Sequence, residues 1–519
     1  MKTTLDDFYA KLFDRYSDSL AIQSEGADLL YGELGEEAAR LANGFREMHL
    51  DVGDRIGVLM QNRYEYIVAE IAAVQAGGVV VPLIDKLDKT DIRYIINDAD
   101  VDILVVGPSY VQIAKEMQAD EDVALDFVVG VMDNEPLPIG FQGYDDIIAK
   151  AESERPSVNL APDDGLLVQY TSGTTGAQKG ALHTHEGIVA NIYSHVSELN
   201  FHHDERMLLM TPLAHSAGYC ARGVLTQGGT IILQNGFGAE RVLRTIESER
   251  VTATFAVPTM ISELLESPDV VERDTDALRT LIYGAAPIPT TTLKKGLERF
   301  GNVFIQLYGL AEVPNLVTVL PKHEHGPDND EGLNSAGYPV QLADVRICSD
   351  ESRWNQDVGE IVVESPYTMA CYLNEDEATD RSEGIRTGDL GRIDDDGRVV
   401  IFDRIDDVIV GQGEPIYSTQ VEDVIQRHPS VSQVAVIGVP VDTNVARHGA
   451  PKPRKEIDQV PKAVVIPSSG TDIDTTDILE FCREHLSERE APESIDMVSK
   501  LPETPHGKID KKTLRKPYW

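Results

Sequence analysis

The chain has 519 residues, which is too long for one hydrophobic core, since cores stop growing at about 250–300 residues and longer chains divide into domains. Its 42% hydrophobic and 26% charged residues are typical of a folded protein and exclude general disorder. The 46 Lys and Arg residues against 87 Asp and Glu residues give a formal net charge of −41, which argues against nucleic acid and anionic membranes as partners.

This excess of acid is typical of a solvated surface or of adaptation to a salt-rich cytoplasm, and we favour the second interpretation. The first ten residues contain no apolar leader, and the longest apolar run, residues 67–84, is broken by polar residues and a proline. We therefore predict a cytoplasmic, halophilic protein without membrane insertion, whose oligomeric state the sequence leaves open. Four cysteines lack metal-ligand spacing, and we expect reduced, mostly buried thiols: Cys220, Cys348, Cys371 and Cys482.

Short apolar runs alternate with amphipathic helical patterns through most of the chain. The spacing predicts a strand at 55–60, a helix over 64–76 and a strand at 78–83. Each further apolar run is bounded by Gly, Pro or polar turn residues, and these runs predict strands at 102–107, 229–234, 253–258 and 278–284. This alternation predicts an α/β fold with parallel strands.

A turn-rich acidic passage at 392–407 separates this part from a final segment with strand-like runs of its own, at 431–440 and 462–467. We therefore predict a large N-terminal α/β domain with parallel-strand subdomains over residues 1–403. The remaining residues, 404–519, are expected to form a small, mobile α+β domain.

Residues 170–185 read YTSGTTGAQKGALHTH, a strand-like lead followed by glycines, hydroxyl residues and one lysine. Glycines let the backbone approach an anion, hydroxyls donate to phosphate oxygens, and Lys179 adds positive charge, so the pattern suits a polyphosphate. The segment is not a Walker A loop. The alternative from composition alone is a flexible surface loop.

This segment resembles the phosphate-binding signature of the adenylate-forming superfamily, which includes acyl-CoA synthetases, peptide-synthetase adenylation domains and beetle luciferases. The segments at 31–45 and 53–83 are similar to the family's N-terminal half, and the remaining signatures follow in the family order. The resemblance implies ATP or AMP contacts from the loop residues Thr171, Ser172, Gly173, Thr174, Thr175, Gly176 and Lys179.

Two further segments resemble the family's nucleotide pocket. YGAAP at 283–287 resembles the wall beside the adenine, and it places Gly284, Ala285 and Ala286 there. QLYGLAE at 306–312 resembles the signature in which Tyr308 and Gly309 lie at the nucleotide and Glu312 binds magnesium. At position 311 the chain has Ala where the family usually has Thr, so one hydroxyl contact to the phosphates is missing.

The last signatures lie near and beyond the predicted domain boundary. By resemblance, Asp389 in RTGDL and Arg404 bind the ribose, and Asp406 is the hinge about which the small domain rotates. The loop at 411–422 faces the CoA tunnel with Gly413, although Gln412 and Pro415 replace the usual Gly and Asn. Lys508, in the C-terminal signature, reaches the carboxylate and the α-phosphate.

The resemblance implies a ligase that joins a fatty or aromatic carboxylic acid to AMP and then to CoA, with ATP, Mg²⁺ and CoA required. Lys508, Glu312 and Thr171 are the expected catalytic residues, and no cysteine is needed as a nucleophile. His215, in TPLAHSAGY, resembles a gate beside the acyl pocket, and a hydrogen-bonded core histidine is an equal alternative. Residues 443–455 form a basic patch that suits the nucleotide end of CoA, although a solvated loop explains it as well.

Two other functions stay open from the sequence. A stand-alone adenylation domain would load a carrier protein instead of free CoA. A non-catalytic nucleotide-binding protein is the other alternative, with Ala311 as its only support.

Overall fold

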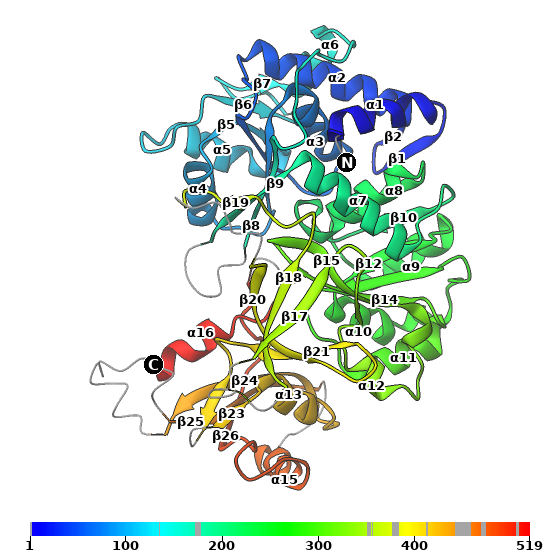
Figure 1. Cartoon of the computed structure of the whole chain (residues 1–519). Helices are drawn as coiled ribbons and strands as arrows, with labels where there is room; N and C mark the ends of the chain where they lie inside the picture. Colours follow the sequence, from blue (N-terminus) through cyan, green and yellow to red (C-terminus); the bar gives the residue numbers. More distant parts are fainter. Residues whose placement is uncertain are drawn as a thin grey trace.

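The structure is a computed structural model that describes residues 3–133, 135–171, 178–349, 354, 357–375, 383–411, 414–441, 458–468, 474–504 and 508–519. Figure 1 shows two large sheets flanked by helices in the first part of the chain, and smaller sheets in its yellow-to-red C-terminal part. The predicted fold class, α/β with a large N-terminal and a small C-terminal part, is confirmed.

The first large sheet has eight strands in the order β19-β9-β8-β4-β3-β5-β6-β7. Its central strands run parallel and are buried, which explains their continuous apolar sequences. The strands predicted at 55–60, 78–83 and 102–107 are present as β3, β4 and β5. In chain order the sheet contains β3 (Arg55–Leu59), β4 (Val79–Leu83), β5 (Val101–Val106), β6 (Phe127–Gly130), β7 (Gln142–Gly143), β8 (Gly165–Tyr170), β9 (Gly180–Thr184) and β19 (Cys371–Tyr372).

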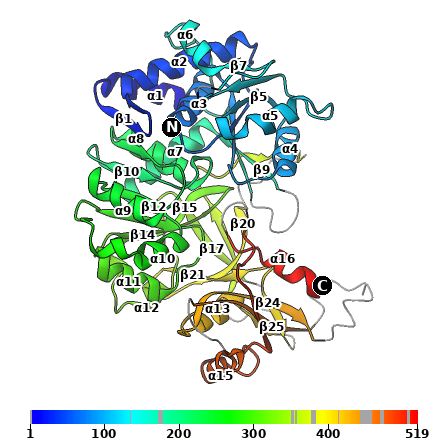
Figure 2. The ribbon, with the colours of Figure 1, turned by 180° about the vertical axis from the view of Figure 1, so that it is seen from behind.

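The second large sheet has nine strands in the order β16-β15-β14-β13-β12-β10-β11-β1-β2. The predicted strands at 229–234, 253–258 and 278–284 are its members β11, β12 and β13. The sheet contains β1 (Leu20–Ser24), β2 (Ala27–Leu30), β10 (Arg206–Leu209), β11 (Thr230–Leu233), β12 (Ala253–Ala256), β13 (Thr280–Gly284), β14 (Phe304–Leu310), β15 (Val313–Leu320) and β16 (Tyr338–Pro339). Strand β1 pairs in parallel with β11, and Figure 2 shows β1 beside α8 in this part of the molecule.

Helices cover both sheets. The predicted helix over 64–76 is α3, which is almost entirely buried because it packs against α2 and against strands of both sheets. It ends at Gly77, whose φ of 86° suits glycine. The other helices of this part are α1 (Leu5–Arg15), α2 (Tyr31–Glu47), α4 (Lys89–Asp98), α5 (Val111–Gln118), α6 (Tyr144–Lys150), α7 (His185–Leu199), α8 (Gly218–Thr226), α9 (Ala239–Ser248), α10 (Pro258–Glu266), α11 (Thr290–Phe300) and α12 (Asp330–Leu333).

Three smaller sheets follow. An antiparallel sheet has the order β17-β18-β20-β21, with β17 (Asp344–Ser349), β18 (Gly359–Glu364), β20 (Ile385–Ile393) and β21 (Val399–Arg404). A two-stranded ribbon contains β22 (Ile409–Gly411) and β23 (Glu414–Ile416). The last sheet comprises β24 (Val431–Pro440), β25 (Gln459–Pro467) and β26 (Ser494–Met497), accompanied by α13 (Ser418–Gln426), α15 (Thr475–His485) and α16 (Lys511–Arg515).

The strands expected at 431–440 and 462–467 are therefore present as β24 and β25. The passage at 392–407 is more regular than its turn-rich sequence predicts. It is a β-hairpin, in which the acidic turn at 394–398 joins β20 to β21, because the apolar run VVIF that follows the turn pairs as a strand.

No helix in the described ranges is long and apolar enough to cross a membrane. Cys220 and Cys482 are buried, as expected, whereas Cys348 and Cys371 are only half-buried. All four are free thiols.

Candidate active site

Three residues predicted to contact the nucleotide lie together, two on the β20–β21 hairpin and one on β14. Asp389 on β20 lies directly across from Arg404 on β21, and Arg404 Nη1 is 3.1 Å from Asp389 Oδ1. The Tyr308 hydroxyl on β14 donates to Asp389 Oδ2 at 2.5 Å. Burial, followed by the Asp389 charge, raises the pKa of Tyr308 well above its usual value, so the hydroxyl stays protonated and remains a donor.

Gly388 is required for this arrangement. Its φ is 72°, and a Cβ on it would stand 3.1 Å from Arg404 Nη2. A side chain at this position would therefore strain the backbone and press on the guanidinium that contacts Asp389. The backbone conformation and the closeness of Arg404 thus explain the glycine of RTGDL, which the sequence pattern alone does not.

Glu312 follows β14 and is the expected ligand of magnesium. Its Oε1 accepts a hydrogen bond from the Tyr372 hydroxyl at 2.5 Å, whereas Oε2 accepts none from the residues that the structure describes. Within the same residues, no three His, Cys, Asp or Glu side chains gather as a complete metal site. One carboxylate with a free oxygen fits a magnesium ion held mainly by nucleotide phosphates.

The carbonyl of Ala311, where the family usually has Thr, lies 2.8 Å from Nε2 of the buried His183. This contact fixes the backbone beside Glu312 but supplies no hydroxyl to a phosphate.

The ends of the predicted phosphate loop are held together. The Thr171 amide donates to the Lys179 carbonyl at 2.9 Å, and the Lys179 amide lies 3.2 Å from the Thr171 hydroxyl. The Lys179 ammonium lies 2.5 Å from a carboxylate oxygen of Glu375 and 4.7 Å from the centre of the Tyr372 ring. The predicted contacts between these ends lie outside the described residues: Ser172, Gly173, Thr174, Thr175 and Gly176.

Close backbone approach explains Gly284 of the expected adenine wall and Gly309 of the QLYGLAE segment. A Cβ on Gly284, the last residue of β13, would stand 2.5 Å from the Leu307 carbonyl oxygen. A Cβ on Gly309 would stand 2.5 Å from the backbone of Asn315. Ala285 adopts a φ of 69° and is exposed next to the half-buried Ala286. Their contact with adenine remains a prediction.

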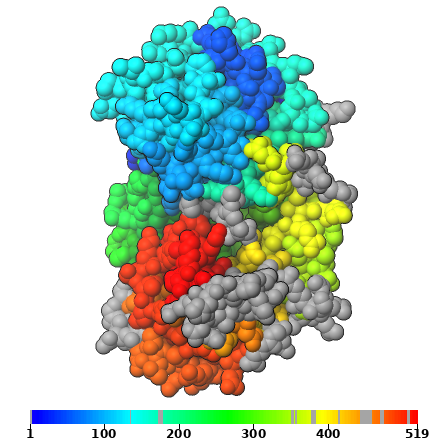
Figure 3. Space-filling view, turned by 90° about the vertical axis from the view of Figure 1, so that its left-hand side faces the viewer, coloured from blue at the N-terminus to red at the C-terminus, as the bar shows by residue number. Residues whose placement is uncertain are grey.

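Lys508 lies close enough to the ribose and metal candidates to interact with their charges. Its side chain keeps access to solvent, but surrounding protein lowers the pKa of its ammonium, while the carboxylates of Asp389 and Glu312 oppose that shift and Arg404 adds to it. In Figure 3 the C-terminal residues, in red, lie beneath the blue and cyan N-terminal residues. The chain therefore brings its last signature to residues more than a hundred positions earlier.

Buried charges anchor the helix that follows Lys508. Lys511 on α16 lies 2.7 Å from both Glu422 Oε1 and the Ser418 hydroxyl on α13. The Ser418 amide and hydroxyl donate to Asp403 Oδ2 at 2.6 and 2.7 Å, and Asp403 immediately precedes Arg404. Polar contacts thus link Lys511, three residues after Lys508, to Asp403, the residue before Arg404.

The remaining candidates are less completely placed. His215 lies in a π-helical turn, Leu213–Ala217, and its Nδ1 is 3.0 Å from the Ser216 hydroxyl. Asp406 lies in the turn between β21 and β22, so its role as a hinge stays a prediction. Gly413 and the basic patch at 443–455 lie outside the described residues.

Tyr372 and Glu375 were missed by sequence reasoning. Tyr372 is 60 residues from Glu312 in the chain, and Glu375 is 196 residues from Lys179. The pairing of β19 with β9 helps bring them to the site, and no local sequence pattern signals it.

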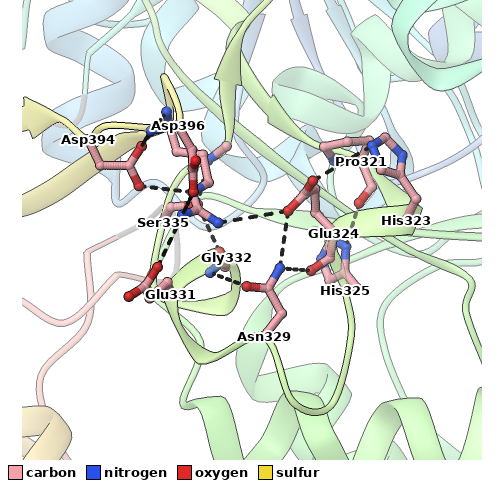
Figure 4. A network of polar contacts seen from close by, with 12 residues as sticks. Pro321, His323, Glu324, His325, Asn329, Glu331, Gly332, Ser335, Asp394 and Asp396 are labelled. Atoms are coloured by element: carbon pink, nitrogen blue, oxygen red, sulfur yellow. Dashed lines mark hydrogen bonds and ion pairs between the residues drawn. The ribbon is translucent and has the colours of Figure 1, made fainter.

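At its far end, the hairpin that carries Asp389 and Arg404 is held by contacts of Arg398, whose acidic partners Asp394, Asp396, Glu331 and Glu324 are labelled in Figure 4. The Arg398 guanidinium is 5% exposed and contacts Asp394 at 2.9 Å, Asp396 at 2.6 Å, Glu331 at 3.4 Å and Glu324 at 3.9 Å. The first two lie in the hairpin turn, whereas the two glutamates lie in the segment leading into α12 and in α12 itself. Arg398 therefore links the β20–β21 hairpin to α12 and to the segment that precedes α12.

Replacement of Arg398 by Met is expected to destabilise the protein by about 2–4 kcal/mol, because four carboxylates then face one another without a cation. Asp396 and Glu331 are largely exposed, so water screens their repulsion and lowers the loss of stability. Added salt should lower it further. Urea denaturation at low and high salt measures both effects. An unchanged unfolding midpoint at low salt would contradict this account of Arg398.

Comparison with known proteins gives a consistent result. Residues 10–373 match the family described as AMP-binding enzyme, and residues 443–508 match the AMP-binding enzyme C-terminal domain. A feruloyl-CoA synthase of Amycolatopsis sp is 34% identical over 503 residues, covering 96% of this chain and 95% of that protein. The medium/long-chain-fatty-acid–CoA ligase FadD8 of Mycobacterium tuberculosis is 31% identical over 505 residues, covering 94% of this chain and 85% of that protein.

Solved structures are similar over the full length as well. The amide bond synthetase McbA from Marinactinospora thermotolerans superposes with a TM-score of 0.86 and is 28% identical, covering 99% of this chain and 100% of that chain.

Proposed function

The chain belongs to the family of AMP-binding enzymes and is an acid–thiol ligase of the acyl-CoA synthetase type, and we propose that its substrate is a fatty or aromatic carboxylic acid. The observation that supports adenylate formation is that the Asp389–Arg404–Tyr308 cluster, Glu312 and Lys508 lie near one another. The names of the similar feruloyl- and fatty-acid–CoA ligases support this substrate class.

In the first half-reaction, a carboxylate oxygen attacks the α-phosphorus of ATP in line with departing pyrophosphate. Asp389 accepts hydrogen bonds from the ribose hydroxyls while Arg404 and Tyr308 hold its two oxygens in place. Lys508 faces the reacting carboxylate and the α-phosphate, where its charge offsets the charge that develops. The protein contributes mainly position and charge, because the acyl-adenylate is itself the activated intermediate.

Magnesium, when bound with ATP, neutralises phosphate charge, and Glu312 supplies the protein oxygen that would hold it. Lys179, which contacts Thr171 and Glu375, would add positive charge beside the phosphates. Two hydrogen bonds with Lys179 fix Thr171, and they hold the Thr171 hydroxyl at the start of the predicted phosphate loop.

In the second half-reaction, the CoA thiolate attacks the acyl carbon and AMP leaves. We assign residues 1–403 to the large domain and 404–519 to a mobile small domain that turns about Asp406 between the two steps. In the second orientation Gly413 would face the pantetheine arm, and the basic patch at 443–455 would meet the nucleotide end of CoA.

The charge of −41 supports a cytoplasmic enzyme that works in concentrated salt. The decisive assay is therefore release of AMP and pyrophosphate from MgATP in high potassium chloride, with short, medium, long and aromatic acids, with CoA or an amine as the acceptor. We expect AMP release that requires both acid and CoA, with a thioester as the product. Amide formation without thioester formation, or no turnover with any acid, would contradict the proposed function.

A further inference from the structure

One short segment, residues 369–375, lies between the two charged groups that face the phosphates. Its backbone is bonded on both sides, because the Met369 amide donates to the Glu312 carbonyl at 2.8 Å and the Leu373 amide donates to the Gly180 carbonyl at 2.8 Å. Between them, Tyr372 of β19 pairs with Ala181 of β9. The segment is therefore fixed to the end of the phosphate loop and to Glu312 at once.

Tyr372 touches both charges. Its hydroxyl donates to Glu312 Oε1 at 2.5 Å, and the Lys179 ammonium lies 4.7 Å from its ring centre. One oxygen of Glu312 is thus held by the tyrosine, and the other accepts no hydrogen bond from the described part of the chain.

Glu375 pairs with the same Lys179 ammonium. The two side chains are 44% and 54% exposed, and the pair is 2.5 Å long. Asn374, with a φ of 59°, fixes the turn before Glu375 by donating to the Asp98 carbonyl at 2.7 Å. The carboxylate therefore occupies the place beside Lys179 that a phosphate oxygen would take.

We propose that Tyr372 positions Glu312 for the cation–phosphate complex, and that Glu375 competes with the nucleotide phosphates for Lys179. The proposal rests on the proposed function in assigning a polyphosphate to this site. Exposed ion pairs contribute little stability, so an incoming triphosphate displaces Glu375 at small cost. Glu375 then acts as a counterion when no nucleotide is bound, and as a repelling charge when one is.

The test is equilibrium binding of ATP, measured by titration calorimetry with and without Mg²⁺. Glu375→Gln is expected to bind ATP about three- to fivefold more tightly than wild type, and the gain should shrink at high salt. Adenosine, which carries no phosphate, should bind both proteins equally. Tyr372→Phe should bind metal-free ATP as wild type does. The increase in ATP affinity that Mg²⁺ causes should be about three- to tenfold smaller in this variant.

Two controls separate this role from general effects of charge and folding. Glu116→Gln breaks the Lys89–Glu116 pair, which is also 2.5 Å long and similarly exposed, and it should leave ATP binding unchanged. In a Lys179→Met background, Glu375→Gln should no longer tighten ATP, because the competition acts through the lysine.

Weaker or unchanged ATP binding by Glu375→Gln, or an equal gain in the Lys179→Met background, would overturn the competition. An unchanged Mg²⁺ enhancement in Tyr372→Phe would overturn the positioning role. A wild-type protein that binds no ATP at all would instead overturn the proposed function together with this inference, so the two failures are distinguishable.

Discussion

Lys508→Ala is expected to slow acyl-adenylate formation by about 100- to 1000-fold, the usual effect of removing one group that stabilises transition-state charge. Thioester formation from a preformed acyl-adenylate should stay near the wild-type rate, because the lysine is proposed to leave the site before CoA reacts. The measurement is rapid-quench kinetics of each half-reaction separately, at saturating MgATP and acid.

Lys500→Ala is the matched control, since it removes an exposed lysine from the same C-terminal segment and should leave both steps unchanged. Surrounding protein lowers the pKa of Lys508, so adenylation should decline with rising pH earlier than the ordinary lysine value implies. Equal loss of both half-reactions in Lys508→Ala would show that the two steps do not use alternate arrangements of the small domain.

The second large effect is on stability and comes from the ion pair between Glu70 on α3 and Arg222 on α8. Arg222 Nη2 lies 2.8 Å from Glu70 Oε1, and each side chain is 9% exposed. Arg222→Met should cost about 3–5 kcal/mol, because it leaves a buried carboxylate without its partner. Chemical denaturation followed by circular dichroism measures the loss.

The pH dependence of this loss has a definite sign. Burial raises the pKa of Glu70 and Arg222 opposes it, so removing the arginine raises the pKa further. In Arg222→Met, the pKa of Glu70 is therefore higher in the folded state than in the unfolded state. The stability of this variant falls as the pH rises above the unfolded-state pKa. The loss should therefore be smallest near pH 4.5 and largest at neutral pH.

A double variant, Glu70→Leu with Arg222→Met, tests the same explanation. Replacing both charges by apolar groups should restore most of the stability that the single variant loses, because no unpaired charge remains. If the double variant is as unstable as Arg222→Met, the loss arises from packing around the Tyr219 ring, which Arg222 also contacts, rather than from the charge.

Much of the fold could be predicted because individual helices and strands leave local patterns of apolar residues in the sequence. Helix α3 coincides with the predicted range, and the apolar strands β3, β4 and β5 differ from theirs only at the ends. The family signatures likewise named Asp389, Arg404 and Tyr308, which the structure joins by direct contacts.

The unpredicted contacts join residues that are distant in sequence. Glu70 and Arg222 are 152 positions apart, and Glu70 appeared in the sequence only as an interruption of an apolar run. In the acidic passage at 392–407, composition shows the aspartates but does not show that Arg398 binds Asp394 and Asp396. Pairing of this kind depends on the completed sheets, which no local pattern specifies.

The order of strands in the second large sheet has a consequence for synthesis on the ribosome. Strands β1 and β2 are made first, yet β1 pairs with β11, about 210 positions later. At about 5–20 residues per second, this hairpin waits roughly 10–40 s for its neighbour. The edge of β1 that later pairs with β11 stays open to other nascent chains during that interval, which makes residues 20–30 a site of aggregation risk during synthesis.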